Sequence, residues 1–286
     1  MAVRKDTIWD NFLKPIFSLL IDQEKLREMQ KNIDWERETE IFRQKDLNYP
    51  DYYISQNFHG IEGGYLNSGA AITYDPITQY VLPPSENWLR QEVISTIGGT
   101  PNRILDLGCG TGSTTLMLKQ AFPNATVMGL DLSPYMLVMA AHKAKEAGLN
   151  LRWRHGLAEA TGLPSESYDV ITISLLFHET PPEVAQSILH ECFRLLTPGG
   201  QVIIFDGNQK TLRQTEWLTN IFEEPYIIDY AAGSVDAWLG AAGFQAVQTE
   251  ELWWVNQVSK GVKPSLKIAD QVTEISMLDQ IPSPVF

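Results

Sequence analysis

A glycine-rich turn after a short apolar run is the part of this sequence best suited to bind a ligand. Residues 104–112 read ILDLGCGTG, with an acid at position 106 and glycine at every second position from 108. Glycine lets the backbone approach a ligand, and the amide end of a helix starting at residue 113 would face the same space. Asp131 ends the next apolar run, where its carboxylate can accept two hydrogen bonds from a ribose diol. The pattern therefore predicts a ligand that contains a nucleoside.

Three kinds of nucleoside site have to be distinguished. A dinucleotide fingerprint requires glycine at its sixth position, where this chain has Ser113. A phosphate-binding loop requires lysine before Ser or Thr, and none occurs between Arg103 and Lys119. What remains is an acidic glycine turn at residues 106–112.

The turn DLGCGTG at 106–112 closely resembles the first motif of class I S-adenosylmethionine-dependent methyltransferases. The segments YDVITIS at 168–174, RLLTPGG at 194–200 and AGF at 242–244 extend the resemblance over about residues 85–264. Within this class the chain is most similar to enzymes that methylate small molecules, including quinone-ring, sterol and tocopherol methyltransferases. The resemblance implies that the cofactor is S-adenosyl-L-methionine.

The resemblance also assigns parts of the cofactor to parts of the chain. Asp106 is expected to face the ammonium group of the methionine part, Asp131 the ribose and Leu132 the adenine. Leu157 stands where an Asp or Asn that binds adenine is usual, so adenine recognition would rest on backbone or on Glu159. The expected cofactor-binding residues are Asp106, Gly108, Cys109, Gly110, Gly112, Asp131, Leu132, Leu157, Ala158 and Ser174.

Methylation of an oxygen or an activated carbon also requires a group that removes a proton. His178 is the first candidate because it follows the run at 168–174 and has an ordinary pKa near neutrality, although it could instead orient the loop. Asp206 is the second candidate, and Glu179 the third, since it could merely favour a helix dipole. No metal is expected, because these three side chains make only a loose set of ligands. The expected substrate contacts are His59, Tyr74 and Tyr226.

The order of apolar runs and amphipathic segments predicts the fold class. Alternating strands and helices indicate an α/β, doubly wound, mostly parallel sheet with helices on both faces. The resemblance implies seven strands in a Rossmann-like methyltransferase fold, closed by an antiparallel hairpin within 244–262, with Trp253 and Trp254 near its turn. Predicted strands are 103–107, 126–131, 151–155, 168–174 and 201–206; predicted helices are 113–122, 133–147, 181–196 and 234–242.

The chain divides into three parts. Residues 1–84 are expected to form a helical extension and a lid, in which an apolar stripe at 8–20 packs on the core or a second subunit; a membrane-surface helix is the alternative. Residues 85–264 form the cofactor-binding domain, with 207–233 as an insertion over the strand ends, and 265–286 form a tail. The aromatic residues of 51–82 and 217–230 favour an apolar acceptor.

The composition of the chain limits the kinds of partner that it is expected to bind. The formal net charge of −13 argues against nucleic acid, which requires clustered Lys and Arg. Apolar runs are far shorter than the ~20 residues of a membrane span, and two cysteines make no disulfide framework, so a cytoplasmic protein is expected. Peripheral membrane contact stays open, and the sequence does not indicate the oligomeric state.

The sequence therefore favours a methyltransferase that modifies an oxygen or activated ring carbon of a small, lipophilic molecule. A non-catalytic cofactor-binding or partner-binding protein with the same fold is the second hypothesis. A nicotinamide-dependent oxidoreductase is the third, and the serine at position 113 counts against it.

Overall fold

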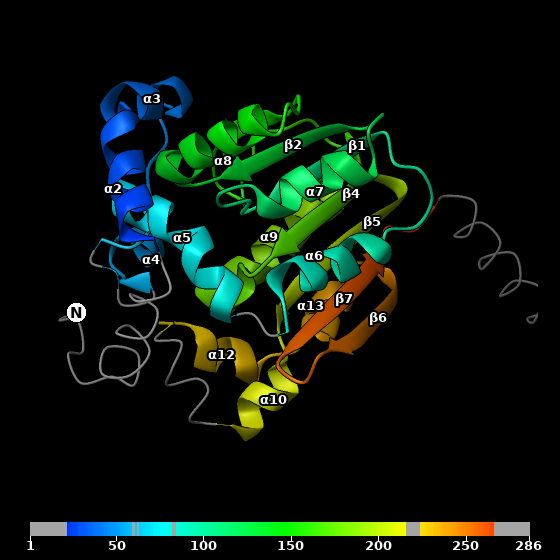
Figure 1. The fold of residues 1–286 in the computed structure, drawn as a ribbon. Helices are drawn as coiled ribbons and strands as arrows, with labels where there is room; N and C mark the ends of the chain where they lie inside the picture. Colours follow the sequence, from blue (N-terminus) through cyan, green and yellow to red (C-terminus); the bar gives the residue numbers. More distant parts are fainter. Residues whose placement is uncertain (1–21, 59–60, 62, 82–83, 216–223, 266–286) are drawn as a thin grey trace, which may run out of the picture.

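The computed structural model describes residues 22–58, 61, 63–81, 84–215 and 224–265, and a seven-stranded sheet forms its centre (Figure 1). The strand order is β3-β2-β1-β4-β5-β7-β6. β1 to β5 run parallel, and β7 is antiparallel to both of its neighbours. The strands are β1 Arg103–Leu107, β2 Thr126–Asp131, β3 Arg152–His155, β4 Tyr168–Ser174, β5 Leu196–Gly207, β6 Gln245–Leu252 and β7 Asn256–Val262.

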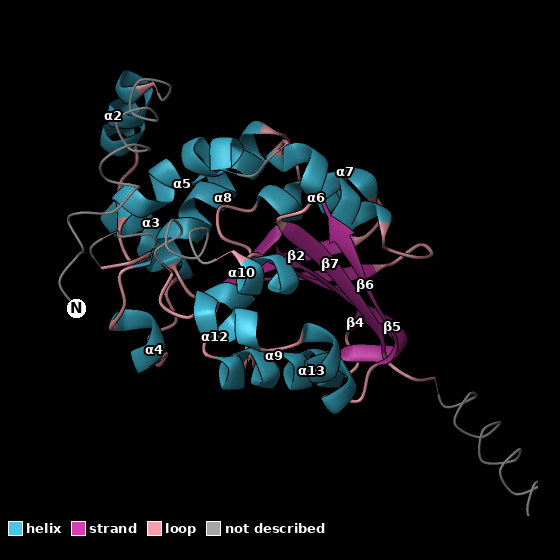
Figure 2. Ribbon diagram, turned by 90° about the horizontal axis from the view of Figure 1, so that it is seen from below, coloured by secondary structure: helices cyan, strands magenta, loops and turns pink. Residues whose placement is uncertain are grey.

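Helices cover both faces of this sheet (Figure 2). One face packs against α6 (Glu86–Ser95) and α7 (Ser113–Ala121), and the other against α9 (Pro182–Leu195) and α13 (Val235–Ala241). Side chains alternate along each strand, so Ile203 joins the first core and Ile204 the second. The central strands are consequently apolar on both faces, as buried parallel strands must be.

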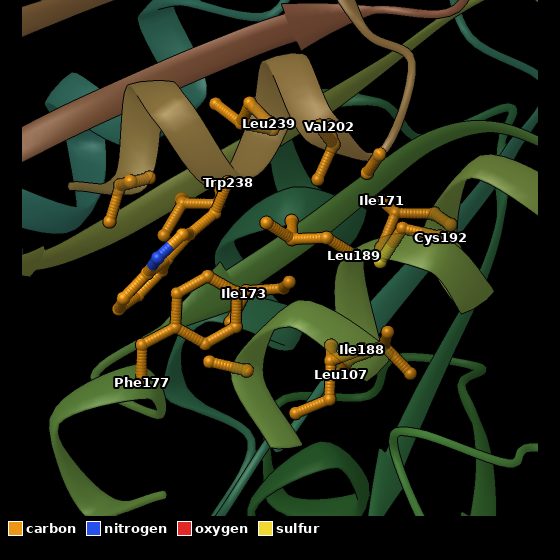
Figure 3. Packing of buried hydrophobic residues seen from close by; sticks show 14 of the residues in the cluster. Leu107, Ile171, Ile173, Phe177, Ile188, Leu189, Cys192, Val202, Trp238 and Leu239 are labelled. Carbon is orange, nitrogen blue, oxygen red and sulfur yellow. The ribbon is translucent and has the colours of Figure 1, made fainter. Parts of the chain in front are cut away.

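The core on the α9 side is tightly packed at the end of β4 (Figure 3). Phe177, in the 3₁₀ turn η3 (Phe177–Glu179), is fully buried and meets the ring of Trp238 edge to face, with ring centroids 6.3 Å apart. Leu107 and Ile173 are fully buried in the same cluster. This packing fixes the loop that follows β4.

The N-terminal helices gather near the carboxyl ends of the parallel strands (Figure 1). A third core cluster joins α8 to the N-terminal helices, with Phe58, Tyr65 and Met136 buried in it. These elements are α2 Gln23–Asn32, α3 Trp35–Phe42, α4 Asp51–Ile54, α5 Ser68–Val81 and α8 Pro134–Glu146. We call residues 51–81 the cover. Part of the cover is packed as core, since Phe58 and Tyr65 are buried in this cluster.

The predicted fold class is confirmed, and the predicted strands and helices match those observed to within a few residues, except at the start of β5. That strand begins at Leu196, before the turn at Gly199, because Leu196 already pairs with Tyr168 of β4. The hairpin turn contains Trp253 and Trp254, as expected. The insertion contributes α10 (Gln209–Gln214) and α12 (Ile227–Ala232). The apolar stripe at 8–20 and the tail after residue 265 lie outside the described residues.

Two further findings bear on the environment of the protein. Among the described residues, every helix is too short or too polar to traverse a bilayer. Cys109 and Cys192 are both buried and unpaired.

Candidate functional site

A pocket opens at the carboxyl ends of β1, β2 and β4, beneath the cover. It encloses about 710 Å³, its mouth included. The topological switch of the sheet, where β1 is flanked by β2 and β4, is the usual ligand position in this architecture. The lining residues are Tyr52, Tyr53, Phe58, Tyr65, Tyr74, Gly108, Gly110, Leu130, Asp131, Leu132, Met136, Gly156, Ala158, Glu159, Ser174, Leu175, Leu176, Glu179, Thr180 and Ile188.

The glycine turn has two kinds of glycine. Gly110 lines the pocket with φ +52°, and a Cβ there would meet only Tyr74, at 4.0 Å, across open space. A Cβ on Gly108 would lie 2.9 Å from the side chain of Leu176, and one on Gly112 would lie 2.7 Å from Trp153. Gly110 therefore leaves room for a ligand, whereas Gly112 leaves room for packing within the fold.

Asp131 lies at the tip of β2 and lines the pocket, as predicted. Its Oδ2 accepts a hydrogen bond from the amide of Gly110 at 2.7 Å, and its Oδ1 accepts one from Ser133 at 2.8 Å. Burial raises the pKa of Asp131 to about 6, against the lowering effect of these two amides. The carboxylate is thus fixed beside the glycine turn and keeps lone pairs for a diol.

Asp106 does not line the pocket, contrary to its expected position facing an ammonium group. Alternation along β1 places it under α7, where its carboxylate accepts hydrogen bonds from Thr115 at 2.5 Å and Thr172 at 2.7 Å. Burial raises its pKa, and the two hydroxyls counteract this. Its observed role is to join β1, α7 and β4. Cys109 and Gly112 are likewise absent from the lining.

The far side of the pocket is formed by the segment after β3. Leu132, Ala158 and Glu159 line it, whereas Leu157 does not. The Tyr52 hydroxyl donates to Oε1 of Glu159 at 2.8 Å, so this carboxylate is held against the cover.

His178 and Asp206 form a pair that lies outside the pocket lining. Nδ1 of His178 lies 2.6 Å from Oδ1 of Asp206, which also accepts from the amide of Gly207, while Oδ2 accepts from the amide of Phe177. Asp206 is fully buried, so its carboxylate is not open to a substrate. This differs from the expectation that Asp206 could act as the base. Burial lowers the pKa of His178, but Asp206 and the hydrogen bond to it outweigh that effect and raise the pKa to about 9.

Glu179 is the charged side chain that the loop after β4 contributes to the pocket. Its Oε1 accepts a hydrogen bond from the hydroxyl of Tyr65 at 2.6 Å and lies 3.9 Å from Nε2 of His178. Tyr65 is buried and stacks on Phe58, with centroids 5.4 Å apart. The carboxylate is therefore held between the cover and the loop after β4.

The charged side chains that line the pocket are all acidic. Asp131, Glu159 and Glu179 are the charged residues of the lining, and no lysine or arginine is among the described residues that form it. The surrounding rings of Tyr53, Tyr74 and their neighbours present π faces that attract cations. Such a site suits a ligand that carries a positive centre and a sugar diol.

The cover is tied to the glycine turn by one carboxylate. Asp75 of α5 accepts hydrogen bonds from Thr111 at 2.5 Å and Ser113 at 3.3 Å. The ammonium group of Lys143 lies 2.6 Å from the same carboxylate and donates to Ser113 at 2.8 Å. This cluster fixes α5 across the pocket edge.

The predicted substrate contacts have different positions. Tyr74 lines the pocket, whereas Tyr226 does not, and the hydroxyl of Tyr226 donates to the backbone oxygen of Tyr52 at 3.1 Å. His59 lies outside the described residues. Sequence reasoning did not single out Tyr53, Tyr65 or the other aromatic cover residues individually, although their clustering in the sequence was a usable signal. Within the described part of the chain, no three His, Cys, Asp or Glu side chains are placed to share a metal ion.

Comparison with known sequences shows which proteins the cofactor-binding region resembles. A family model described as a methyltransferase domain matches residues 104–200. A demethylmenaquinone methyltransferase of Thermus thermophilus is 37% identical over 119 residues, which are 42% of this chain and 53% of the relative. The same enzyme of Lactococcus lactis is 35% identical over 142 residues, 49% of this chain and 56% of the relative. The chain thus spans about half the length of these curated relatives.

Solved structures show the same fold. An S-adenosylmethionine-dependent methyltransferase from Aquifex aeolicus aligns with a TM-score of 0.53 at 20% identity, covering 68% of this chain and 98% of that one. Phosphoethanolamine N-methyltransferase 2 of Haemonchus contortus, in complex with S-adenosyl-L-methionine, aligns with a TM-score of 0.55 at 14% identity, covering 78% and 62%. At these identities the likeness is one of fold. Together with the family model, it identifies residues 104–200 as a methyltransferase domain, similar in sequence to that of the demethylmenaquinone methyltransferases.

Proposed function

We propose that this chain transfers a methyl group from S-adenosylmethionine to an oxygen or activated ring carbon of a small, lipophilic aromatic molecule. The observation that carries the proposal is the joint presence in one pocket of Asp131, the open face of Gly110 and the aromatic cover. The cofactor, when bound, supplies an electrophilic methyl group on a positively charged sulfur. The three lining carboxylates and the absence of Lys and Arg among the described lining residues favour such a cation.

The residues of the pocket have separate proposed roles toward the cofactor. Asp131 binds the ribose diol, and Leu132, Ala158 and Glu159 surround the base. Gly108, Gly110 and Ser174 bind the methionine end, where glycine permits close approach of the backbone. Asp106 acts from behind β1 by fixing Thr115 and Thr172, and therefore the start of the turn.

The acceptor is proposed to be an uncharged aromatic ring. Tyr53, Phe58, Tyr65 and Tyr74 offer ring faces for stacking, and the pocket's carboxylates would repel a phosphate or carboxylate on the acceptor. The demethylmenaquinone methyltransferases among the relatives support a reduced quinone ring as one member of this class.

The protein's contribution to the reaction is alignment and exclusion of water. Methyl transfer is an in-line displacement in which the positive charge on sulfur disappears, so a dry, well-oriented pocket favours it. The Asp75 cluster holds α5 over the pocket edge, and the buried rings of Phe58 and Tyr65, which also belong to the cover, exclude solvent from the pocket. A cytoplasmic location and the absence of a nucleic-acid partner remain predictions.

The proposal is tested by label transfer. The full chain is incubated with methyl-labelled S-adenosylmethionine and either chemically reduced demethylmenaquinone or a total lipid extract, and the products are separated. Label is expected in an aromatic product, and heat-treated protein serves as the control. Cofactor binding without transfer to either acceptor pool would favour the non-catalytic alternative instead.

A further inference from the structure

We propose that Glu179, held by Tyr65, takes the proton that the acceptor loses on methylation, and that His178 and Asp206 position Glu179 instead of acting on substrate. This inference rests on the proposed function and names the group that completes it. It reverses the order of candidates given by the sequence, where His178 was first and Glu179 third.

The loop after β4 determines which of its side chains reaches the pocket. The two oxygens of Asp206 hold the amide of Phe177 and Nδ1 of His178, while Phe177 is buried in the core beneath. Glu179 is the last residue of the 3₁₀ turn. Because Phe177 and His178 are fixed in this way, it is the side chain of Glu179 that lines the pocket. The turn therefore presents a carboxylate to the ligand and keeps the imidazole behind it.

The surroundings of His178 do not suit a base. One ring nitrogen is engaged by Asp206, and the other is directed at Glu179, 3.9 Å away. The raised pKa of His178 means that the ring is an imidazolium at neutral pH, which has no lone pair for a proton. The imidazolium therefore helps to hold the Glu179 carboxylate in place instead of accepting a proton.

The surroundings of Glu179 do suit a base. Its side chain is 13% exposed and lies among the pocket's aromatic rings, with Tyr65 donating to Oε1 at 2.6 Å. This hydrogen bond fixes the orientation of the carboxylate. The titratable groups that interact electrostatically with Glu179 are Tyr53, Tyr65, Tyr74, Asp131 and His178, and Glu224 acts on Tyr65 and His178.

The proposed step balances as follows. The acceptor atom forms a bond to the methyl carbon, the bond between that carbon and sulfur breaks, and its electron pair stays on sulfur. The hydrogen on the acceptor atom leaves as a proton to Glu179, and its bonding pair stays on the acceptor. Glu179 then releases the proton to solvent when the products leave.

The first test is kinetic. In single turnovers with reduced demethylmenaquinone, or with the lipid identified by label transfer, Glu179→Gln is expected to lower the rate at pH 7 about 10²-fold or more. The variant's rate should then rise with pH as the acceptor ionises by itself, and its affinity for S-adenosylmethionine should stay within about twofold of wild type. Tyr65→Phe is expected to lower the rate less than Glu179→Gln does, because the carboxylate is kept but loses the donor that orients it.

Glu159→Gln is the matched comparison, since Glu159 is also a pocket carboxylate bonded to a tyrosine hydroxyl. It is expected to weaken cofactor binding, and its rate should not show the rise with pH that is expected of Glu179→Gln. A loss of rate in Glu179→Gln that is equal at every pH would indicate a structural role and overturn the inference. If Glu179→Gln has the wild-type rate and pH profile and still transfers label, the inference is overturned and the proposed function stands. If the wild-type chain transfers no label to any acceptor, both fall.

The second test does not depend on turnover. 4-Nitrophenol, whose neutral and ionised forms differ in absorbance, is titrated with pH in the presence of the chain and S-adenosylhomocysteine. A nearby carboxylate favours the neutral phenol, so the pKa of the bound probe should be raised by wild type and by Glu159→Gln but not by Glu179→Gln. Failure of the probe to bind wild type, or an equal shift in all three proteins, would overturn the inference.

Discussion

Nδ1 of His178 lies 2.6 Å from Oδ1 of Asp206, and this bond joins the loop after β4 to the end of β5. Asp206 is fully buried and also holds the amides of Phe177 and Gly207. The pair therefore fixes the loop from which Glu179 reaches the pocket. Its charge state links the stability of the fold to pH.

The His178–Asp206 pair predicts a stability that declines in mild alkali. The pKa of His178 is about 9 in the folded chain and about 6.5 in the unfolded chain. Because the folded value is the higher one, the stabilisation is complete below about pH 6.5 and is lost as pH rises through about 9. Denaturant unfolding should show the free energy of unfolding falling on the order of 3 kcal/mol across this window. His178→Gln should flatten that slope; an unchanged slope would refute the assignment.

Asp131 predicts a pH dependence of cofactor binding. Its pKa is raised by burial to about 6, so the carboxylate becomes protonated below that pH and loses acceptor capacity toward a diol. The dissociation constant for S-adenosylmethionine should rise as pH falls through about 6. Asp131→Asn should bind weakly with little dependence on pH in the same titration. Equal pH profiles for the two proteins would contradict the ribose role.

The two glycines of the turn predict separable effects of alanine. The Cβ of Gly110→Ala would meet open space, so the variant should lose only about 1 kcal/mol of unfolding free energy, because alanine disfavours a left-handed backbone. The added methyl group should, however, obstruct the cofactor. Gly112→Ala places a Cβ 2.7 Å from Trp153 and should destabilise the fold by about 3 kcal/mol or more. Thermal unfolding and cofactor titration of both variants distinguish the two cases. If Gly110→Ala mainly destabilised the fold and Gly112→Ala mainly weakened cofactor binding, Gly112 and not Gly110 would be the glycine that faces the cofactor.

The Asp75 cluster predicts slower cofactor release in the wild-type chain than in a variant with a loosened cover. Asp75→Ala removes the partner of Thr111, Ser113 and Lys143 and should raise the cofactor dissociation rate about tenfold, measured by stopped-flow displacement. Thr73→Ala is the control, because that hydroxyl donates within α5. Similar dissociation rates in both variants would show that the cluster does not hold the cover.

The sequence predicted the sheet well because apolar runs, glycine turns and helix ends carry local signals. It also placed Asp131 correctly, since a strand tip can be located from the run that precedes it. It did not predict that Asp106 lies outside the pocket lining, because the side of the strand on which an acid lies depends on alternation relative to helices not yet positioned. In the fold Asp106 pairs in register with Thr172 and lies under α7.

The base could not be ranked from the sequence for a similar reason. His178 and Glu179 are adjacent in the chain, and only the packing of Phe177 and the bonds to Asp206 decide which one faces the pocket. The contribution of Tyr65 comes from a segment more than a hundred residues away, joined to Glu179 by tertiary contact. Composition identified the cover as aromatic, but not which of its rings line the site.

The central claim is that the pocket at the ends of β1, β2 and β4 binds S-adenosylmethionine. Isothermal titration of the full chain with this cofactor at pH 7.5 tests it most directly, with Asp131→Ala titrated in parallel. The account predicts saturable binding at one site in wild type and a loss of about 100-fold or more in affinity in the variant, because hydrogen bonds to a charged acceptor disappear. Absence of binding to wild type, or equal affinity in both proteins, would contradict it.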